Sequence, residues 1–311
     1  MQTILGANGQ IAEELTRELY RNYSKDIRLV SRNPKKVNET DQLFPANLLD
    51  AQATEKAIDG SNIVYFTVGL PMDSQIWKDQ FPVIVQNVIR ACIKHNASLV
   101  FFDNTYMYSK TSEPQTEESP FVPKGPKSTV RAIMAEMVLN LIKNNSIRAV
   151  ICRAPEFYGP NKTQSITNTL LFDNISQKKR LKVPLKDDKK RTLIWTPDAS
   201  RAMALIGNTP EAFNQTWHLP CDDRRPTYKE LIQIASEVYG QNFQYTILKM
   251  WIFKLGSIFN KQMKELLELL PRYQHDYFFI SDKFKKRFPS FKVTTYKEGI
   301  TEIKNELSTG I

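Results

Sequence analysis

The sequence predicts an α/β fold built on a doubly wound parallel sheet, with a smaller, mostly helical C-terminal domain. Short β-like runs alternate with helical patterns through the first half of the chain. These runs are rich in Val, Ile and Phe without strict alternation, which is typical of strands buried on both faces. A turn containing two glycines joins the first strand to the first helix. Together these observations indicate a Rossmann-type domain.

The expected elements of the first half follow one another along the chain. They are "TIL", a helix over residues 9–23, "IRLVS", "NIVYFTVG", a helix over 74–95, "SLVFFD", a helix over 127–144 and "IRAVICRAP". In the second half we expect a helix over 165–177, the strand "LKVP", and helical segments over 249–270 and 296–307. Two further helices carry start signals: Thr196 as a cap before Pro197, and Thr227 as a cap with Gly240 as the stop.

Composition narrows the class of protein. The three cysteines, Cys92, Cys152 and Cys221, are widely spaced among apolar neighbours, which favours reduced buried thiols and no metal site. The N-terminus lacks the pattern of a secretory signal, so we expect a cytoplasmic protein. The net charge of +10 comes without a nucleic-acid recognition motif, so no nucleic-acid partner is expected.

The run "MWIFKLGSIF" has about half the length that a bilayer requires and predicts a buried or interface helix. We therefore expect no membrane partner.

The segment "ILGANGQIAEEL" has the features of a phosphate-binding turn. Gly6 and Gly9 permit a tight turn and a close approach of backbone to a pyrophosphate, while the helix N-terminus offers N–H groups to the anion. Ala12 occupies the third glycine position and still allows close packing of helix on strand. The residues expected to bind a dinucleotide here are Gly6, Asn8, Gly9, Gln10 and Ile11.

The end of the second strand, "LVSRNPKK", indicates which dinucleotide binds. An acidic residue that would hold the ribose hydroxyls of NAD is absent from this segment. Arg32 can complement a 2′-phosphate instead, so the sequence favours NADP, with NAD left open.

With these motifs, the chain resembles the extended and atypical short-chain dehydrogenase/reductase superfamily, in particular its NAD-dependent epimerase/dehydratase-like group. The similar segments are "GANGQIA", "PANLLD", "YFTVGLP", "FFDNTYMYS", "RAPEFYGP" and "WTPDASRAM". The resemblance implies further coenzyme contacts from Asn47, Leu48, Thr67, Val68 and Gly69 near adenosine, and from Pro155, Phe157 and Tyr158 near the nicotinamide. We expect a coenzyme domain of residues 1–160 plus 191–220 and a substrate domain of residues 161–190 plus 221–311.

The catalytic motif departs from that group. The usual Ser/Thr position falls on Asn104 or Thr105, and the usual Tyr-x-x-x-Lys becomes Lys127-x-x-x-Arg131. Arg131 can hold ribose hydroxyls or a substrate oxyanion, but it does not titrate near neutral pH. Lys127 lies at a helix N-terminus one turn from another cation, which disfavours its charged form and makes it a candidate proton donor.

Other hydroxyls are alternatives for the acid, namely Tyr106, Tyr108 and Tyr158. The leading hypothesis is therefore an NAD(P)-dependent oxidoreductase or epimerase-like enzyme acting on a small carbonyl or hydroxyl compound or a nucleotide sugar. The alternative is a catalytically inactive NADP(H)-binding sensor or regulatory protein. The sequence leaves open whether the protein forms a homodimer.

Overall fold

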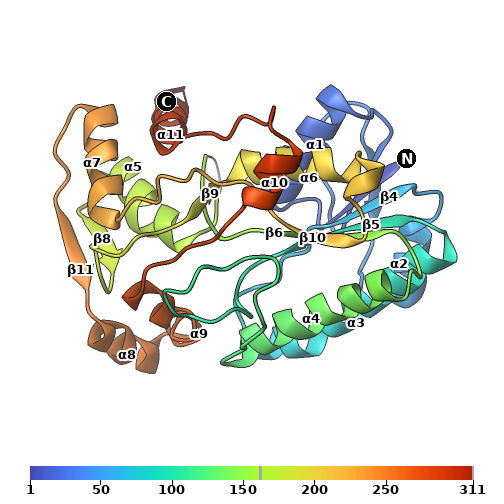
Figure 1. Ribbon diagram of the computed structural model, residues 1–311, viewed down its shortest axis with the longest axis horizontal. Coiled ribbons are helices and arrows are strands. Elements are labelled where there is room, and N and C mark those ends of the chain that lie inside the picture. The colour runs from blue at the N-terminus through green and yellow to red at the C-terminus, as the bar shows by residue number, and fades with distance from the viewer. Residues whose placement is uncertain (161–162, 310–311) are drawn as a thin grey trace. The chain divides into compact units, whose positions relative to one another are not determined.

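The computed structural model describes residues 1–160 and 163–309, with side chains described as far as Leu307. The chain forms two compact units (Figure 1). The first unit contains Met1–Met107, Pro123–Ala154 and Ala199–Leu219, and the second contains Tyr108–Val122, Pro155–Asp198 and Pro220–Ile311.

A seven-stranded parallel sheet forms the centre of the first unit, in the order β10-β6-β5-β4-β1-β2-β3. Six of these strands follow the Rossmann order, and β10 extends the edge beside β6. The strands are β1 (Gln2–Leu5), β2 (Ile27–Ser31), β3 (Gln42–Pro45), β4 (Ile63–Phe66), β5 (Ser98–Asp103), β6 (Ala149–Arg153) and β10 (Gln215–His218). This arrangement confirms the predicted fold class.

Helices cover both faces of this sheet. In Figure 1, α2, α3 and α4 lie on one face, with α1 and α6 on the other. Their bounds are α1 (Gln10–Asn22), α2 (Ala51–Ile58), α3 (Ser74–Lys94), α4 (Pro126–Lys143) and α6 (Thr196–Gly207), with the short 3₁₀ helix η2 at Pro210–Ala212.

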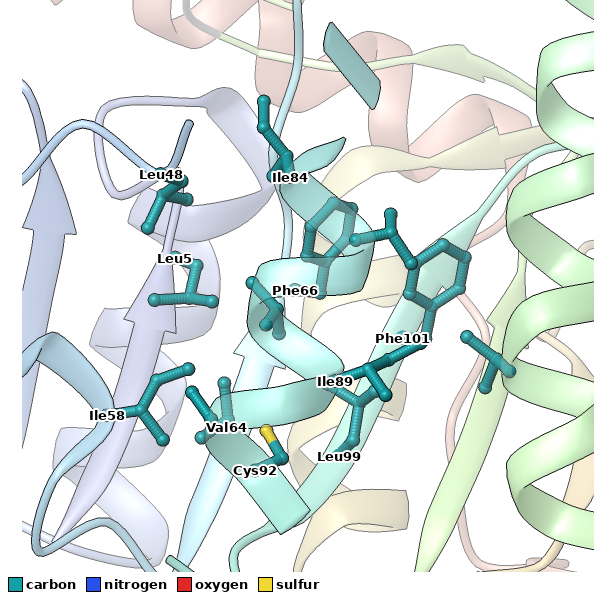
Figure 2. Packing of buried hydrophobic residues seen from close by; sticks show 14 of the residues in the cluster. Leu5, Leu48, Ile58, Val64, Phe66, Ile84, Ile89, Cys92, Leu99 and Phe101 are labelled. Carbon is teal, nitrogen blue, oxygen red and sulfur yellow. The ribbon is translucent and has the colours of Figure 1, made fainter. Parts of the chain in front are cut away.

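The core under α3 and α4 follows from the apolar pattern of the strands. Figure 2 shows strand side chains such as Leu5, Phe66 and Phe101 in one cluster with Ile89 and Cys92 of α3. Phe66 and Phe101 stack with ring centroids 4.9 Å apart. The three cysteines are free and buried, as predicted, and burial raises the pKa of the Cys92 thiol to about 12.

The second unit contains two small parallel pairs, β7 with β9 and β8 with β11. Its strands are β7 (Glu156–Tyr158), β8 (Leu181–Pro184), β9 (Leu193–Trp195) and β11 (Tyr245–Leu248). Its helices are η1 (Asn168–Phe172), α5 (Asp173–Ser176), α7 (Tyr228–Tyr239), α8 (Met250–Phe259), α9 (Lys261–Leu266), η3 (Leu270–Gln274), α10 (Asp282–Arg287) and α11 (Tyr296–Thr309). Among the described residues, no helix is long and apolar enough to cross a membrane.

Local signals in the sequence predicted several helix ends. Asp73 caps α3, and Thr227 forms a capping box with Glu230 at the start of α7. Gly240 ends α7 in the left-handed conformation, with φ of 69°.

Two helix predictions were wrong in detail. The expected helix over 165–177 is π-helical at Asn168–Phe172 before the single turn α5. The expected helical segment over 249–270 breaks at Asn260, whose extended backbone ends α8 and whose side chain accepts a hydrogen bond from Met263 N to start α9. Thr196 is the first residue of α6, and its hydroxyl donates to the Tyr158 carbonyl at 3.2 Å.

The boundaries of the two compact units fall at different residues from those of the expected domains. Residues 155–160 and 191–198 belong to the second unit, because β7 pairs with β9. Residues 108–122 also belong there, where Gln115 bridges to Phe279. The expected boundary at 160/161 adjoins residues 161–162, which with 310–311 lie outside the described residues.

A buried ion pair links Glu156 of β7 to Arg191 within the second unit. Glu156 accepts hydrogen bonds from Thr167 N at 3.2 Å and Thr167 Oγ1 at 2.8 Å. Its other oxygen pairs with Arg191 Nη2 at 3.2 Å. Arg191 also donates to the Arg272 carbonyl and lies 4.4 Å from the ring centroid of Tyr273. Loss of one partner would leave a buried charge without compensation.

We predict that Glu156→Ala lowers the free energy of unfolding by about 3–5 kcal/mol, because Arg191 stays buried. Denaturant unfolding followed by circular dichroism measures the change. The control is Glu55→Ala, which removes a pair with Lys94 whose side chains are both largely exposed, and costs about 0–1 kcal/mol. Equal small losses for both variants would contradict the assignment.

Candidate functional site

The site lies where the sheet order reverses in the first unit. β1 has β2 on one side and β4 on the other, so successive crossovers run in opposite directions from this point. In open parallel sheets, a ligand binds at the carboxyl ends of the strands at such a switch point. Gly6 follows β1 here, and Thr67 follows β4.

Gly6 packs against the backbone after β4. A Cβ atom at Gly6 would lie 2.8 Å from Val68 Cα and 2.9 Å from the Thr67 carbonyl oxygen. Gly6 also has φ of +86°, a conformation that favours glycine. Two independent constraints therefore require glycine at this position.

The turn ends at the N-terminus of α1. Gly9 is the N-cap, its N–H donates to the Gly6 carbonyl at 3.0 Å, and as a glycine it has no side chain to cap the helix. Gln10 is the first helical residue, and Ile11 is buried with its carbonyl accepting from Ser200 Oγ at 3.0 Å. A helix N-terminus without a side-chain cap, behind a glycine turn, can hold a phosphate group.

Asn8 connects this turn to the loop after β2. Its amide donates to the Asn33 carbonyl at 2.7 Å, and its oxygen accepts from Lys35 N at 3.2 Å. Arg32 is exposed on the same loop. Ser31 Oγ is enclosed and has no hydrogen-bond partner among the described residues. The sequence predicted Asn8 as a contact of the coenzyme. In the structure its side chain forms hydrogen bonds with the backbone of the loop that carries Arg32.

The other residues expected near adenosine lie after β3 and β4. Asn47 is exposed, and its side chain accepts from Leu49 N at 3.2 Å. Leu48 is buried in the core cluster beneath α3 (Figure 2). Thr67 Oγ1 donates to the Leu5 carbonyl at 2.8 Å, which joins the ends of β1 and β4. A Cβ at the exposed Gly69 would meet no atom within 4 Å.

Lys127 and Arg131 lie one turn apart on α4, as the sequence predicted. The side chain of Lys127 is 1% exposed, and its Nζ donates to Ser74 Oγ, at the start of α3, at 2.9 Å. The structure thus gives Lys127 a hydroxyl neighbour that the sequence did not indicate, because the two residues are far apart in the chain.

Arg131 is enclosed by aromatic rings and an acid. Its guanidinium lies 5.1 Å from the ring centroid of Trp77 and 4.8 Å from that of Phe81. Asp103 Oδ1 lies 3.8 Å from Arg131 Nη1. Burial lowers the pKa of the Arg131 guanidinium, and the Asp103 carboxylate opposes that shift. A guanidinium held in this way can position other groups, but its five-donor fork does not act as a general acid.

Asp103 joins two cations at the end of β5. It is 1% exposed, and its Oδ2 accepts from Arg153 Nε at 3.1 Å while its other oxygen faces Arg131. Asp103 and Arg153 are register partners on the neighbouring strands β5 and β6. Sequence reasoning missed this pair, although Asp103 ends the predicted strand "SLVFFD" and Arg153 lies two residues before the end of "IRAVICRAP".

Asn104 and Thr105 follow Asp103 directly. The Asn104 side chain accepts from Tyr106 N at 3.0 Å, and Thr105 is 2% exposed. Tyr106 stacks on Trp77 with an interplanar angle of 5°. Trp77 therefore touches both the segment after β5 and the Arg131 side chain.

The remaining candidates belong to the second unit. Pro155 and Tyr158 are buried there, and Phe157 is half-buried. Tyr158 is stacked on Tyr296, and burial raises the pKa of its hydroxyl well above the ordinary value. The Tyr108 hydroxyl donates to the Thr116 carbonyl at 3.0 Å. Tyr108 and Tyr158 are packed aromatic residues in this structure.

The fold and the turn at Gly6 define a Rossmann-type α/β protein with a glycine turn before its first helix. No group of His, Cys, Asp and Glu suited to a metal ion occurs among the described residues. The chain belongs to the NAD dependent epimerase/dehydratase family, because that family's sequence profile matches residues 3–219. This match confirms the resemblance that the motifs indicated.

Solved structures of the same fold are similar over the whole chain. UDP-glucuronic acid 4-epimerase from Bacillus cereus in complex with NAD matches with a TM-score of 0.79 and 15% identity over 99% of each chain. UDP-glucose 4-epimerase from Thermus thermophilus in complex with NAD matches with a TM-score of 0.78 and 14% identity over 100% of each chain. At such identities the likeness establishes the fold. A comparison with curated proteins found no match.

We predict that Gly6→Ala lowers NADPH affinity at least tenfold, because the added Cβ meets the backbone after β4 and the residue must keep a positive φ. Titration of NADPH fluorescence measures the affinity, and unfolding without coenzyme shows whether the variant folds. The control, Gly60→Ala, adds the same methyl group at another glycine of positive φ, where the nearest atom would lie 3.6 Å away, and should keep wild-type affinity. A folded Gly6→Ala protein that binds NADPH normally would contradict this assignment.

Proposed function

We propose that this chain binds NADP(H) and is an NAD(P)-dependent oxidoreductase or epimerase-like enzyme. The single observation that carries the proposal is the approach of Gly6 to the backbone at Thr67 and Val68, at the switch point of the sheet. Membership of the NAD dependent epimerase/dehydratase family supports it. When bound, the coenzyme supplies or accepts a hydride. The residues below bind, orient and transfer protons around it.

The coenzyme-binding residues suit a dinucleotide with an additional phosphate. The turn at Gly6 and the N-terminus of α1 would hold the pyrophosphate. Arg32 would pair with a 2′-phosphate, with Ser31 Oγ as a second donor that has no partner among the described residues. No acidic residue occurs between Ser31 and Lys36 to hold the ribose hydroxyls of NAD. This difference supports NADP over NAD.

Lys127 is the proposed proton donor. It is buried, as a group that transfers a proton away from bulk water should be, and Ser74 Oγ accepts a hydrogen bond from its Nζ. Arg131 is the positioning residue, because Trp77, Phe81 and Asp103 fix its orientation. Asn104 and Thr105 occupy the place of the usual Ser/Thr and would orient the reacting oxygen. In this proposal Lys127 supplies the proton that a tyrosine supplies elsewhere in the family.

The proposed substrate is a small carbonyl or hydroxyl compound or a nucleotide sugar. The similar structures include proteins described as epimerases of UDP-glucuronic acid, UDP-glucose and UDP-N-acetylglucosamine. A UDP-sugar is anionic, and the chain carries a net charge of +10. The free, buried cysteines support a reducing, cytoplasmic location.

A second function is a coenzyme-dependent regulatory protein without catalysis. The enclosure of both cations favours it: Lys127 is 1% exposed and Arg131 is 8% exposed. Such a protein would bind NADPH and NADP⁺ tightly, turn over no substrate, and change its affinity for a partner with the redox state of the coenzyme.

Replacement of Arg32 tests the coenzyme preference. We predict that Arg32→Ala lowers NADPH affinity about tenfold or more, since a charged hydrogen bond contributes about 1.5–3 kcal/mol, and leaves NADH affinity unchanged. Fluorescence titration with both coenzymes measures the ratio. Lys25→Ala removes an exposed cation before the opposite end of β2 and serves as the control. Equal losses for both coenzymes would contradict a 2′-phosphate contact.

Replacement of Lys127 tests the reaction. We predict that Lys127→Met, which keeps most of the buried volume, lowers kcat about 10²- to 10⁴-fold and changes NADPH affinity less than threefold. A coenzyme-oxidation screen over carbonyl compounds and UDP-sugars first identifies the substrate, and kcat is then compared between the wild type and the variant.

Lys143→Met, an exposed position on the same helix, is the control for the Lys127 experiment. If the wild-type protein binds NADPH tightly and turns over none of these compounds, the enzyme proposal fails and the regulatory one stands.

A further inference from the structure

Helix α8 exposes an unusual amount of apolar surface. Trp251 is 63% exposed, Leu255 52%, Ile258 72% and Phe259 85%. These are the four most exposed large apolar side chains among the described residues, and all four lie on this ten-residue helix. The sequence predicted a buried or interface helix here, and only one of its residues, Phe253, is buried.

The four side chains form a stripe along one face of α8. Successive residues of an α-helix are rotated by about 100°, so positions 251, 255, 258 and 259 fall within an arc of about 100°. Phe253 lies on the opposite side and is 4% exposed within the core of the second unit. The inward face of α8 is therefore occupied by its own unit, and the stripe faces outward.

The helix is held in place by its neighbour α9, which lies beside it in Figure 1. Met263 of α9 packs so closely against Gly256 of α8 that a Cβ atom there would overlap its sulfur. Asn260 joins the two helices and caps α9 by accepting from Met263 N. The stripe is thus presented by a braced helix pair and not by a loose segment.

Lysine residues surround the stripe. Lys249, Lys254, Lys261 and Lys264 are all exposed, and Glu265 is the one acidic residue from Lys249 to the end of α9 at Leu266. Lys254 projects next to the stripe, about 40° around the helix from Ile258. The segment from 249 to 266 therefore carries a formal charge of +3 beside its apolar surface.

This charge decides between the surfaces that would cover the stripe. A second copy of the chain joined through the same face would bring two sets of four lysines together, and such juxtaposition of like charges is unfavourable. An anionic bilayer complements both features, because apolar and aromatic side chains enter the boundary between headgroups and acyl chains while lysines meet the anionic headgroups.

We infer that the α8 stripe docks this protein on the surface of an anionic membrane, with Trp251, Leu255, Ile258 and Phe259 inserted. Helix α8 is too short to cross a bilayer, but this mode of binding does not require a spanning helix, because the helix lies in the plane of the interface. The inference is independent of the proposed reaction, since α8 belongs to the second unit and contributes no residue to the site at Gly6.

Tryptophan fluorescence of the full chain tests the inference directly. The chain has four tryptophans, and Trp77, Trp195 and Trp217 are each at most 4% exposed. A change on adding vesicles therefore reports Trp251. Vesicles of phosphatidylcholine with phosphatidylserine should shift the emission to the blue and co-sediment the protein, whereas vesicles of phosphatidylcholine alone should do so far less. Trp251→Phe should abolish the shift while sedimentation persists.

Variants separate the apolar and electrostatic contributions. The double variant Ile258→Gln with Phe259→Gln should weaken vesicle binding at least tenfold, and Lys254→Gln or Lys264→Gln about fivefold each, since one lysine near an anionic surface contributes about 1 kcal/mol. Ile93→Gln on α3 and Lys56→Gln on α2 remove an exposed apolar and an exposed basic side chain elsewhere and should leave binding unchanged. Circular dichroism confirms that each variant folds.

Three results would overturn the inference. The first is no co-sedimentation with anionic vesicles at low ionic strength. The second is vesicle binding that the control variants weaken as much as the α8 variants. The third is sedimentation velocity showing that the α8 variants dissociate a dimer of the wild-type chain that does not bind vesicles, because a second copy would then cover the stripe.

Discussion

The contact between the turn at Gly6 and the backbone after β4 is the constraint on which the first unit depends. Thr67 donates both its N–H and its hydroxyl to the Leu5 carbonyl, so the ends of β1 and β4 are joined directly beneath the turn. Gly6 then passes over Thr67 and Val68 without room for a side chain. This approach places the start of α1, whose N-cap residue, Gly9, has no side chain. The join between the ends of β1 and β4 thus lies at the proposed phosphate site.

A second set of contacts replaces the usual catalytic apparatus. This chain has Lys127 and Arg131 in place of the tyrosine and lysine of the usual motif. Asp103 and two aromatic rings surround Arg131. Asp103 compensates Arg131 and Arg153 together, which makes burial of two guanidinium groups tolerable. Lys127 is separated from this cluster by one helical turn and is bound to Ser74 instead. In the proposed reaction, Arg131 is the positioning residue and Lys127 is the proton donor.

The second unit combines two different kinds of surface. Around Glu156 and Arg191, charged groups are buried and compensated within the unit. On α8, apolar groups are exposed and flanked by lysines. Burial of paired charges gives a defined interior, whereas an apolar stripe left in water favours association with another surface. The second unit therefore compensates its buried charges internally and exposes an apolar surface on α8.

The sequence by itself determined the parallel sheet, the glycine turn and the absence of an acid after β2, because these depend on local patterns of two to ten residues. It also placed Lys127 and Arg131 on one helix face, since a spacing of four fixes that geometry. It could not show that Asp103 meets Arg153, that Ser74 meets Lys127, or that Trp77 and Phe81 enclose Arg131, because strand register and helix packing bring these residues together from distant positions. The apolar residues of α8 were also evident in the sequence, but only the tertiary structure showed that Phe253 is buried and that the stripe is exposed. Burial depends on how the whole chain packs, and a helix with this same sequence could equally lie in a protein core.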